Sequence, residues 1–81
     1  MREDILAGLR ELLRSNFEDE SLVITADTVL DDIEDWDSME MVAVISMTES
    51  YYGIHYSVEE TIAMSNAKTV AEMVDIISQK L

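Results

Sequence analysis

The sequence predicts an all-α domain, a bundle of four helices in which three are longer and the third is short. The chain has 81 residues, enough for one domain with a modest core. It contains no proline and two glycines, which disfavours an all-β fold because the many tight turns of such a fold need these residues. Apolar residues recur at helical spacing in several blocks, so residues 1–81 are expected to form a single helical domain.

The first helix is expected to end near Phe17, and Gly8 weakens it without breaking it. Apolar residues occupy one face and charged residues the other; the apolar residues are Ile5, Leu6, Leu9, Leu12 and Leu13. The polar stretch 18–37 that follows is long for a loop, and loops of this length tend to be functional. Its apolar residues indicate that it packs across the core; they are Leu22, Val23, Ile24, Val29, Leu30 and Ile33.

The second helix is expected to begin at Asp37, which forms with Glu40 an Asp-x-x-Glu variant of the capping box. It should end before Gly53, since glycine readily adopts the left-handed conformation that stops a helix. Apolar residues continue through the segment, and two tyrosines, Tyr51 and Tyr52, close it.

The last two helices carry their own start signals. Ser57 with Glu60 predicts a short third helix over residues 58–63, and Thr69 with Glu72 predicts the start of the fourth. The fourth helix presents one apolar face, made of Val70, Met73, Val74, Ile77 and Leu81.

Charge and cysteine content exclude several classes of function. The formal net charge is −13, and no Lys or Arg occurs between Arg14 and Lys68, an interval that holds 13 of the 18 acidic residues. Such a surface repels nucleic acid and anionic membranes and favours partners with basic patches, although scattered acids can simply keep a protein soluble. Without cysteine there is no disulfide and no thiolate metal site. With no apolar signal or membrane-spanning segment, a cytoplasmic, monomeric protein without membrane insertion is expected.

The most informative position is Ser38, which follows a run of acids and opens the second helix. A hydroxyl there lies beside the unpaired amides of the first helical turn, where an anion such as phosphate is stabilised. Modification by another enzyme requires only that this hydroxyl is exposed at a helix start on an acidic surface. The alternative is an ordinary first-turn serine.

Other chemistry has weak support. Asp31, Asp32 and Asp35 match the Asp-Asp-x-x-Asp pattern of isoprenoid synthases, but 81 residues cannot build the large helical barrel of those enzymes. A calcium-binding loop lacks its required glycine. Ser38 has no nucleophile elbow, and the single histidine, His55, has no evident orienting partner, so catalytic activity is not expected.

Two apolar residues near Ser38 have two interpretations each. Trp36 could dock a partner, but a lone tryptophan in a small domain more often completes the core, and we favour the core. The methionines could fill the core or form an adaptable contact surface. Since Met39 directly follows Ser38, we expect it to be exposed and to contact partners.

The stretch from Thr28 to Val42 resembles the 4′-phosphopantetheine attachment site of acyl and peptidyl carrier proteins, with Asp37-Ser38 at the head of a helix. The resemblance extends over nearly the whole chain, from the amphipathic first helix and long connection to the Gly-Ile-x-Tyr segment and the Lys68-Thr69-Val70 helix start. It implies a four-helix bundle of the acyl-carrier-protein type.

The resemblance also implies a function. A phosphopantetheinyl transferase would transfer the arm from coenzyme A to Ser38, with Asp37 helping to recruit the transferase. The thiol of the arm would carry acyl or aminoacyl groups as thioesters to loading and modifying enzymes with basic docking patches. Partner docking is carried over to Met39, Glu40, Val42 and, later on the helix, Glu49.

Two residues differ from the pattern of fatty-acid carriers and bear on which pathway is expected. Ala43 and Ser46 occupy positions where fatty-acid carriers commonly have an acid and an exposed apolar residue, which favours a dedicated pathway for polyketides, aminoacyl groups or specialised lipids. The competing interpretation is an unmodified acidic helical adaptor that acts only through protein contacts.

The acidic interval leads to a testable expectation about stability. Because its carboxylates repel one another, moderate salt or divalent cations should raise the melting temperature by screening that repulsion. Thermal unfolding followed by circular dichroism across a salt series measures this effect. A flat or falling melting temperature contradicts it.

Overall fold

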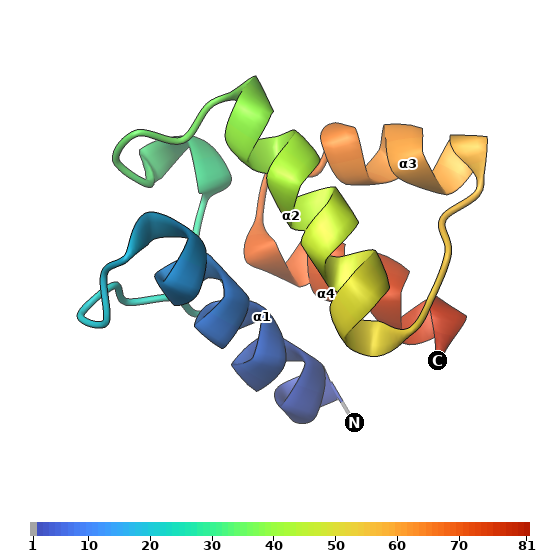
Figure 1. The fold of residues 1–81 in the computed structure, drawn as a ribbon, viewed down its shortest axis with the longest axis horizontal. Helices are drawn as coiled ribbons and strands as arrows, with labels where there is room; N and C mark the ends of the chain where they lie inside the picture. The colour runs from blue at the N-terminus through green and yellow to red at the C-terminus, as the bar shows by residue number, and fades with distance from the viewer. Residues whose placement is uncertain (1) are drawn as a thin grey trace.

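Four α-helices build the protein in a computed structural model that describes residues 2–81 (Figure 1). They are α1 (Arg2–Phe17), α2 (Ser38–Tyr52), α3 (Val58–Ser65) and α4 (Val70–Lys80), with a short 3₁₀ helix, η1 (Leu30–Asp32), before α2. Within residues 2–81 there is no β-strand, so the all-α prediction with four helices is confirmed. No helix in this range is both long and apolar enough to cross a bilayer.

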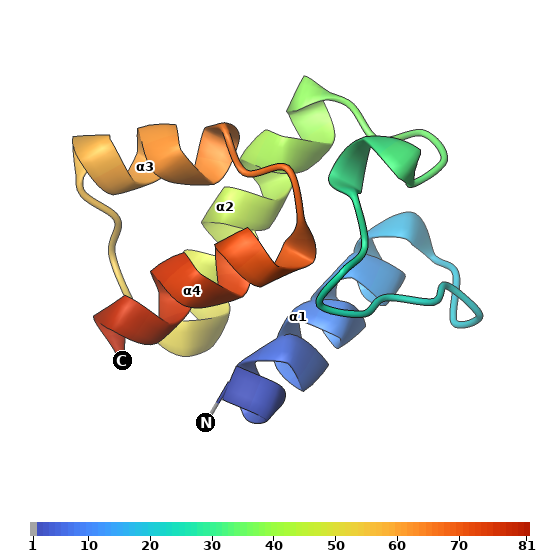
Figure 2. The same cartoon turned by 180° about the vertical axis from the view of Figure 1, so that it is seen from behind.

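The helices enclose one core. α1 packs against α2 and α4, and α3 packs against α2 and α4. Figures 1 and 2 show the connection from α1 to α2 at one side of this bundle and α3 at the other. Residues from every helix and from the α1–α2 connection are buried in the core, including Leu9, Leu13, Leu30, Val44, Met64, Met73 and Ile77.

Local signals set most helix ends as predicted. Ser57 with Glu60, and Thr69 with Glu72, form complete capping boxes at the starts of α3 and α4. Gly53 ends α2 in the left-handed conformation (φ 65°), which costs glycine little. The predicted end of the third helix at residue 63 was two residues short, because α3 continues to Ser65.

The α1–α2 connection crosses the core and hydrogen-bonds to the segment that leads into α4. The amide of Leu30 donates to the Lys68 carbonyl (2.9 Å) and the amide of Val70 donates to the Thr28 carbonyl (3.0 Å). Val29 thereby forms an isolated antiparallel bridge with Thr69. The prediction that this connection packs on the core is confirmed for Ile24, Leu30 and Ile33, which are buried.

Three apolar residues assigned to the core by the sequence are exposed instead. Val23 is 76% exposed and Val29 is 40% exposed, whereas the residue that follows each of them, Ile24 or Leu30, is buried. Leu81 lies beyond the last residue of α4 and is 52% exposed.

Gly8 is the point of close approach between α1 and α2. The Tyr52 hydroxyl donates to the Ile5 carbonyl (2.8 Å) across this contact. A Cβ atom on Gly8 would lie 2.5 Å from the Tyr52 hydroxyl oxygen and 3.0 Å from Cε1 of Tyr51. Burial raises the pKa of Tyr52 to about 12. The absence of a side chain at Gly8 therefore allows α1 and α2 to pack closely where they cross.

We expect Gly8→Ala to lower the free energy of unfolding by about 1 kcal/mol, the lower end of the cost of overpacking. In an open helix the same change would stabilise the protein, since alanine is the better helix former. Urea unfolding of Gly8→Ala, Tyr52→Phe and the double variant measures the coupling. Removal of the Tyr52 hydroxyl should abolish most of the cost of the added methyl. An equal cost in both backgrounds would show that Tyr52 is not the obstacle.

Candidate functional site

The chain turns sharply just before Ser38. The Trp36 amide donates to the Ile33 carbonyl (3.1 Å), and Asp35 has a positive φ of 68°. Asp37 is extended (φ −148°) and caps α2, with its carboxylate accepting from the Glu40 amide at 2.9 Å. This turn and cap make Ser38 the first residue of α2.

The capping box predicted at this helix is only half formed. Asp37 caps the Glu40 amide, but the Glu40 carboxylate accepts a hydrogen bond from the Asn16 side chain of α1 and does not return to the Asp37 amide. The tertiary contact between α1 and α2 has replaced the local bond. Glu40, predicted to dock partners, is therefore part-buried and engaged within the domain.

The Ser38 side chain is exposed, and its hydroxyl makes no hydrogen bond with any other residue in the range 2–81. The amides of Ser38 and Met39 likewise have no protein acceptor in this range. Two amides at the positive end of α2 therefore remain available beside the hydroxyl, the arrangement that favours a phosphate group.

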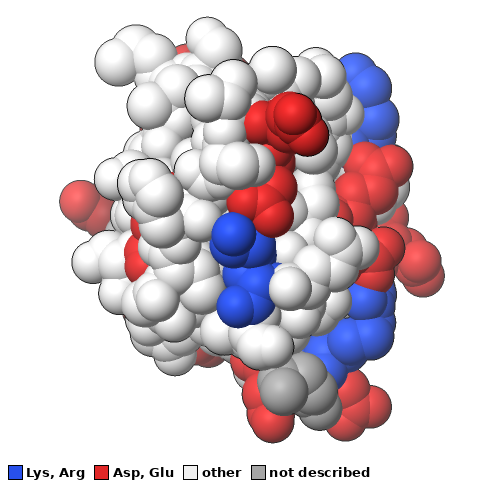
Figure 3. Space-filling model, turned by 90° about the vertical axis from the view of Figure 1, so that its right-hand side faces the viewer, with Lys and Arg blue, Asp and Glu red and all other residues white. Residues whose placement is uncertain are grey.

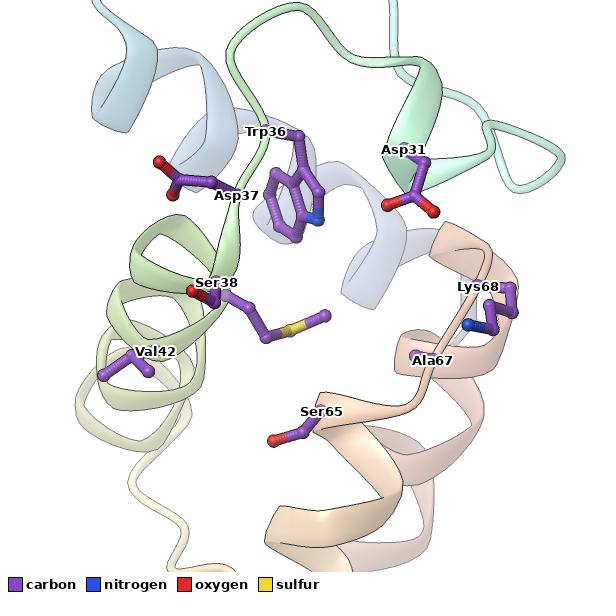
Figure 4. A pocket seen from close by; sticks show the side chains of 9 residues that line it. Asp31, Trp36, Asp37, Ser38, Val42, Ser65, Ala67 and Lys68 are labelled. Atoms are coloured by element: carbon purple, nitrogen blue, oxygen red, sulfur yellow. The ribbon is translucent and has the colours of Figure 1, made fainter.

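A cavity of about 300 Å³ lies beside Ser38. Figure 4 shows it between the start of α2, the end of α3 and the segment that joins α3 to α4, with Ser38 at its edge. Its walls contain apolar and charged side chains from these elements and from η1, namely Asp31, Trp36, Asp37, Ser38, Met41, Val42, Ser65, Ala67 and Lys68.

Trp36 belongs to both the core and this cavity. Its ring lies 6.2 Å from that of Phe17, centroid to centroid, and it packs against the core while remaining half-buried. Figure 4 shows its indole projecting into the cavity. The expected core position was therefore only partly correct, because one side of the ring packs on the core and the other lines the cavity.

Lys68 is the residue of this cavity that sequence reasoning missed. The side chains of the other four of the five basic residues have partners. Arg2 pairs with Asp75 and Lys80 with Glu60. Arg10 donates to the backbone carbonyl of Ile24, and Arg14 donates to the backbone carbonyl of Leu22 and pairs with Glu11. Within residues 2–81 the Lys68 ammonium makes no ion pair or hydrogen bond. The one signal in the sequence is that Lys68 is the first basic residue after the long acidic interval.

The apolar residues predicted to meet partners are exposed. Met39 and Val42 are 78% and 66% exposed, three residues apart on the same side of α2. Val58 and Ile62 on α3 are also exposed, a surface the sequence had not indicated. Figure 3 shows the side of the molecule on which α3 lies in Figure 1, where uncharged surface covers most of the left part of the view and acidic and basic side chains gather along the right-hand edge.

Glu49, the fourth predicted docking residue, has a structural role. Its carboxylate accepts from the Tyr56 amide (2.8 Å) and lies 3.4 Å from Nδ1 of His55. It thereby holds the connection between α2 and α3 to the end of α2. Its docking role stays a prediction. Glu49 is a neighbour of His55 that the sequence did not indicate, and the His55 side chain itself is 93% exposed.

The described residues contain no group of side chains arranged for serine hydrolysis or for metal binding. Ser38 and His55 lie at opposite ends of α2, whose 15 residues span roughly 22 Å, so His55 cannot act as a base for Ser38. The acids Asp31, Asp32 and Asp35 are exposed, and no group of three or more potential ligands in residues 2–81 could hold a metal ion.

The structure defines this protein as a four-helix all-α domain with an exposed serine at the head of α2 and a cavity beside it. Comparison with known proteins adds no further assignment, because no family model, curated protein or solved structure matches the chain.

The cap that positions Ser38 can be tested directly. We expect Asp37→Ala to lower the free energy of unfolding by about 1 kcal/mol, since the Glu40 amide loses its acceptor. Asp37→Asn is the matched control and should retain most of the stability, because asparagine caps about as well as aspartate. Urea unfolding measures both variants. Equal stability of Asp37→Ala and the parent protein would contradict a capping role.

Proposed function

We propose that this protein is a carrier that holds acyl or aminoacyl groups as thioesters on a 4′-phosphopantetheine arm attached to Ser38. The observation that supports it most is the Ser38 side chain itself, which is exposed, has no hydrogen-bond partner in residues 2–81 and heads a capped helix. A partner enzyme can reach such a hydroxyl without any unfolding of the domain.

The residues around Ser38 fit a phosphodiester. The amides of Ser38 and Met39 are available as donors, and Lys68 supplies a positive charge in the adjoining cavity. The negative charge of Asp37 opposes an anion here, but one of its oxygens already accepts the Glu40 amide. Asp31, which lines the same cavity, also opposes an anion, so the fit depends on the two available amides at the start of α2 and on Lys68.

Attachment requires one substitution at phosphorus. The Ser38 oxygen attacks the phosphorus of coenzyme A that bears pantetheine, and the P–O bond to adenosine 3′,5′-bisphosphate breaks. The hydroxyl proton passes to a base on the phosphopantetheinyl transferase, and the bisphosphate leaves with the bonding electrons. Once attached, the arm would supply a thiol that takes acyl groups from activated carboxylic acids, with release of the activating group. Asp37 serves by fixing the start of α2 and by offering charge to the transferase.

Partner enzymes would dock on α2 beside Ser38. Met39 and Val42 offer exposed apolar surface next to the modified residue, and the net charge of −13 steers the protein toward basic patches. Glu40 and Glu49 border this surface, but their internal hydrogen bonds leave them less able to pair with a partner.

In this proposal the cargo belongs to a dedicated cytoplasmic pathway for polyketides, aminoacyl groups or specialised lipids. Ser46 is exposed and Ala43 half-buried on α2, so this part of the helix lacks the charge and apolar side chain that general fatty-acid enzymes would contact. The protein itself performs no catalysis and serves its partners as a monomer.

A second function, that of an unmodified adaptor, has one supporting observation. Exposed apolar residues on both α2 and α3, among them Met39, Val42, Val58 and Ile62, could bind a protein partner without any modification of Ser38. In that case Ser38 is only the first residue of a capped helix.

Modification distinguishes the two functions. Incubation of the purified protein with coenzyme A and a broad-specificity phosphopantetheinyl transferase should add the mass of one phosphopantetheinyl group, measured by intact-mass spectrometry. Ser38→Ala should abolish the gain, whereas Ser46→Ala, an exposed serine on the same helix, should leave it unchanged. No gain under conditions that modify a known carrier would favour the adaptor.

A further inference from the structure

A second cavity lies between the end of α1 and the turn that precedes α2. In Figures 1 and 2 these two segments lie next to each other, at the side of the bundle away from α3. The cavity shares no residue with the one beside Ser38. Its volume is about 150 Å³, and its lining consists of Phe17, Asp19, Leu22, Ile33, Glu34 and Asp35.

The apolar part of this lining is supported by the core. Ile33 is buried, and Phe17 and Leu22 are half-buried and pack against the core. The ring of Phe17 also lies 6.2 Å from that of Trp36, centroid to centroid. An occupant of the cavity therefore meets an aromatic ring and two aliphatic side chains.

Three carboxylates border this apolar surface. Oδ1 of Asp19 accepts the amide (3.0 Å) and the hydroxyl (2.6 Å) of Ser21, which leaves Oδ2 without a partner in residues 2–81. Within the same range the carboxylates of Glu34 and Asp35 accept no hydrogen bond and form no ion pair. The cavity thus combines an apolar surface with negative charge that an outside cation can pair with.

The arginines of this chain are engaged elsewhere. Arg14 attracts Asp19, but its guanidinium donates to the Leu22 carbonyl at 2.9 Å. Arg2 pairs with Asp75, and Arg10 donates to a backbone carbonyl. A second copy of the chain therefore has no unengaged arginine to offer, and the net charge of −13 opposes its approach.

The size and lining of the cavity select its occupant. At about 150 Å³ it is smaller than the roughly 300–1,000 Å³ of small-molecule sites, so it suits a single side chain. An arginine has a methylene stem that packs on apolar residues and a planar cation that stacks on aromatic rings and pairs with carboxylates. Lysine offers a strongly hydrated point charge instead. A metal ion fits poorly, since no group of three or more potential ligands in residues 2–81 could hold one.

From these observations we propose that the cavity binds one arginine side chain of a partner protein, with its stem and guanidinium plane on Phe17 and Leu22 and its N–H groups directed to Asp19 and Asp35. Asp35 precedes Ser38 by three residues, so their Cα atoms are at most about 11 Å apart. A protein that reaches Ser38 therefore comes close to this cavity. The inference does not depend on modification of Ser38.

Peptide binding tests the proposal. The probe is a capped tripeptide with arginine between two glycines, and the matched peptides carry lysine or the neutral isostere citrulline. Titration of the full-length, isotope-labelled protein at constant ionic strength is followed by NMR. The arginine peptide should give saturable shifts at Phe17, Leu22 and Ile33, with a dissociation constant of about 1–10 mM for so small a ligand. Lysine should bind about threefold more weakly, and citrulline should give no saturable shift.

One pair of variants separates this cavity from the general acidity of the surface. Asp35→Asn removes a carboxylate of the cavity and keeps a residue that tolerates the positive φ found there. It should weaken binding of the arginine peptide about two- to fivefold, as expected for loss of one exposed ion pair. Asp27→Asn is the matched control, because it removes an exposed carboxylate of the same connection outside the cavity, and should change nothing. Circular dichroism checks that both variants are folded.

Several outcomes would overturn the proposal. They are equal affinities for the arginine and citrulline peptides, shifts that spare Phe17, Leu22 and Ile33, and equal weakening by Asp35→Asn and Asp27→Asn. Equal affinities for arginine and lysine would overturn the choice of arginine. The gain of mass at Ser38 is measured separately, so failure of the carrier function and failure of this inference are distinguishable.

Discussion

The pairing between the α1–α2 connection and the segment before α4 positions the candidate site. Backbone hydrogen bonds join Leu30 to Lys68, Val70 to Thr28 and Ala71 to Ala26, so two segments about forty residues apart in sequence are held side by side. The pairing buries Leu30, holds η1 against the bundle and places Lys68 and Asp31 across the cavity from the head of α2.

Not every acid of the long acidic interval contributes to a docking surface. Glu40 accepts a hydrogen bond from α1 through Asn16, and Glu49 accepts the Tyr56 amide at the other end of α2. Glu60 completes a helix cap and pairs with Lys80, and the backbone hydrogen bond from Ser57 lowers the pKa of its carboxyl group. These carboxylates stabilise helix ends and contacts between elements. Partner recognition on α2 then depends more on the exposed apolar residues Met39 and Val42.

Helix starts were predictable because their signals are local. A side-chain oxygen at the cap and an amide three residues later are fixed by the covalent chain, as at Ser57 and Thr69. At Asp37 the same rule predicted the cap correctly. It did not predict that the Glu40 carboxylate would accept a hydrogen bond from Asn16, which is distant in sequence. Similarly, Val23 and Val29 are exposed while the next residues, Ile24 and Leu30, are buried and hydrogen-bonded to distant parts of the chain.

The sequence by itself determined the all-α class, the helix starts and the exposed position of Ser38, because periodicity, caps and charge act over a few residues. The tertiary structure alone decided that Gly8 must admit the Tyr52 hydroxyl, that Trp36 is shared between core and cavity, and that Lys68 shares a cavity with Ser38. These features depend on which segments pack together, and contacts between residues far apart in the chain leave no local pattern from which they can be read.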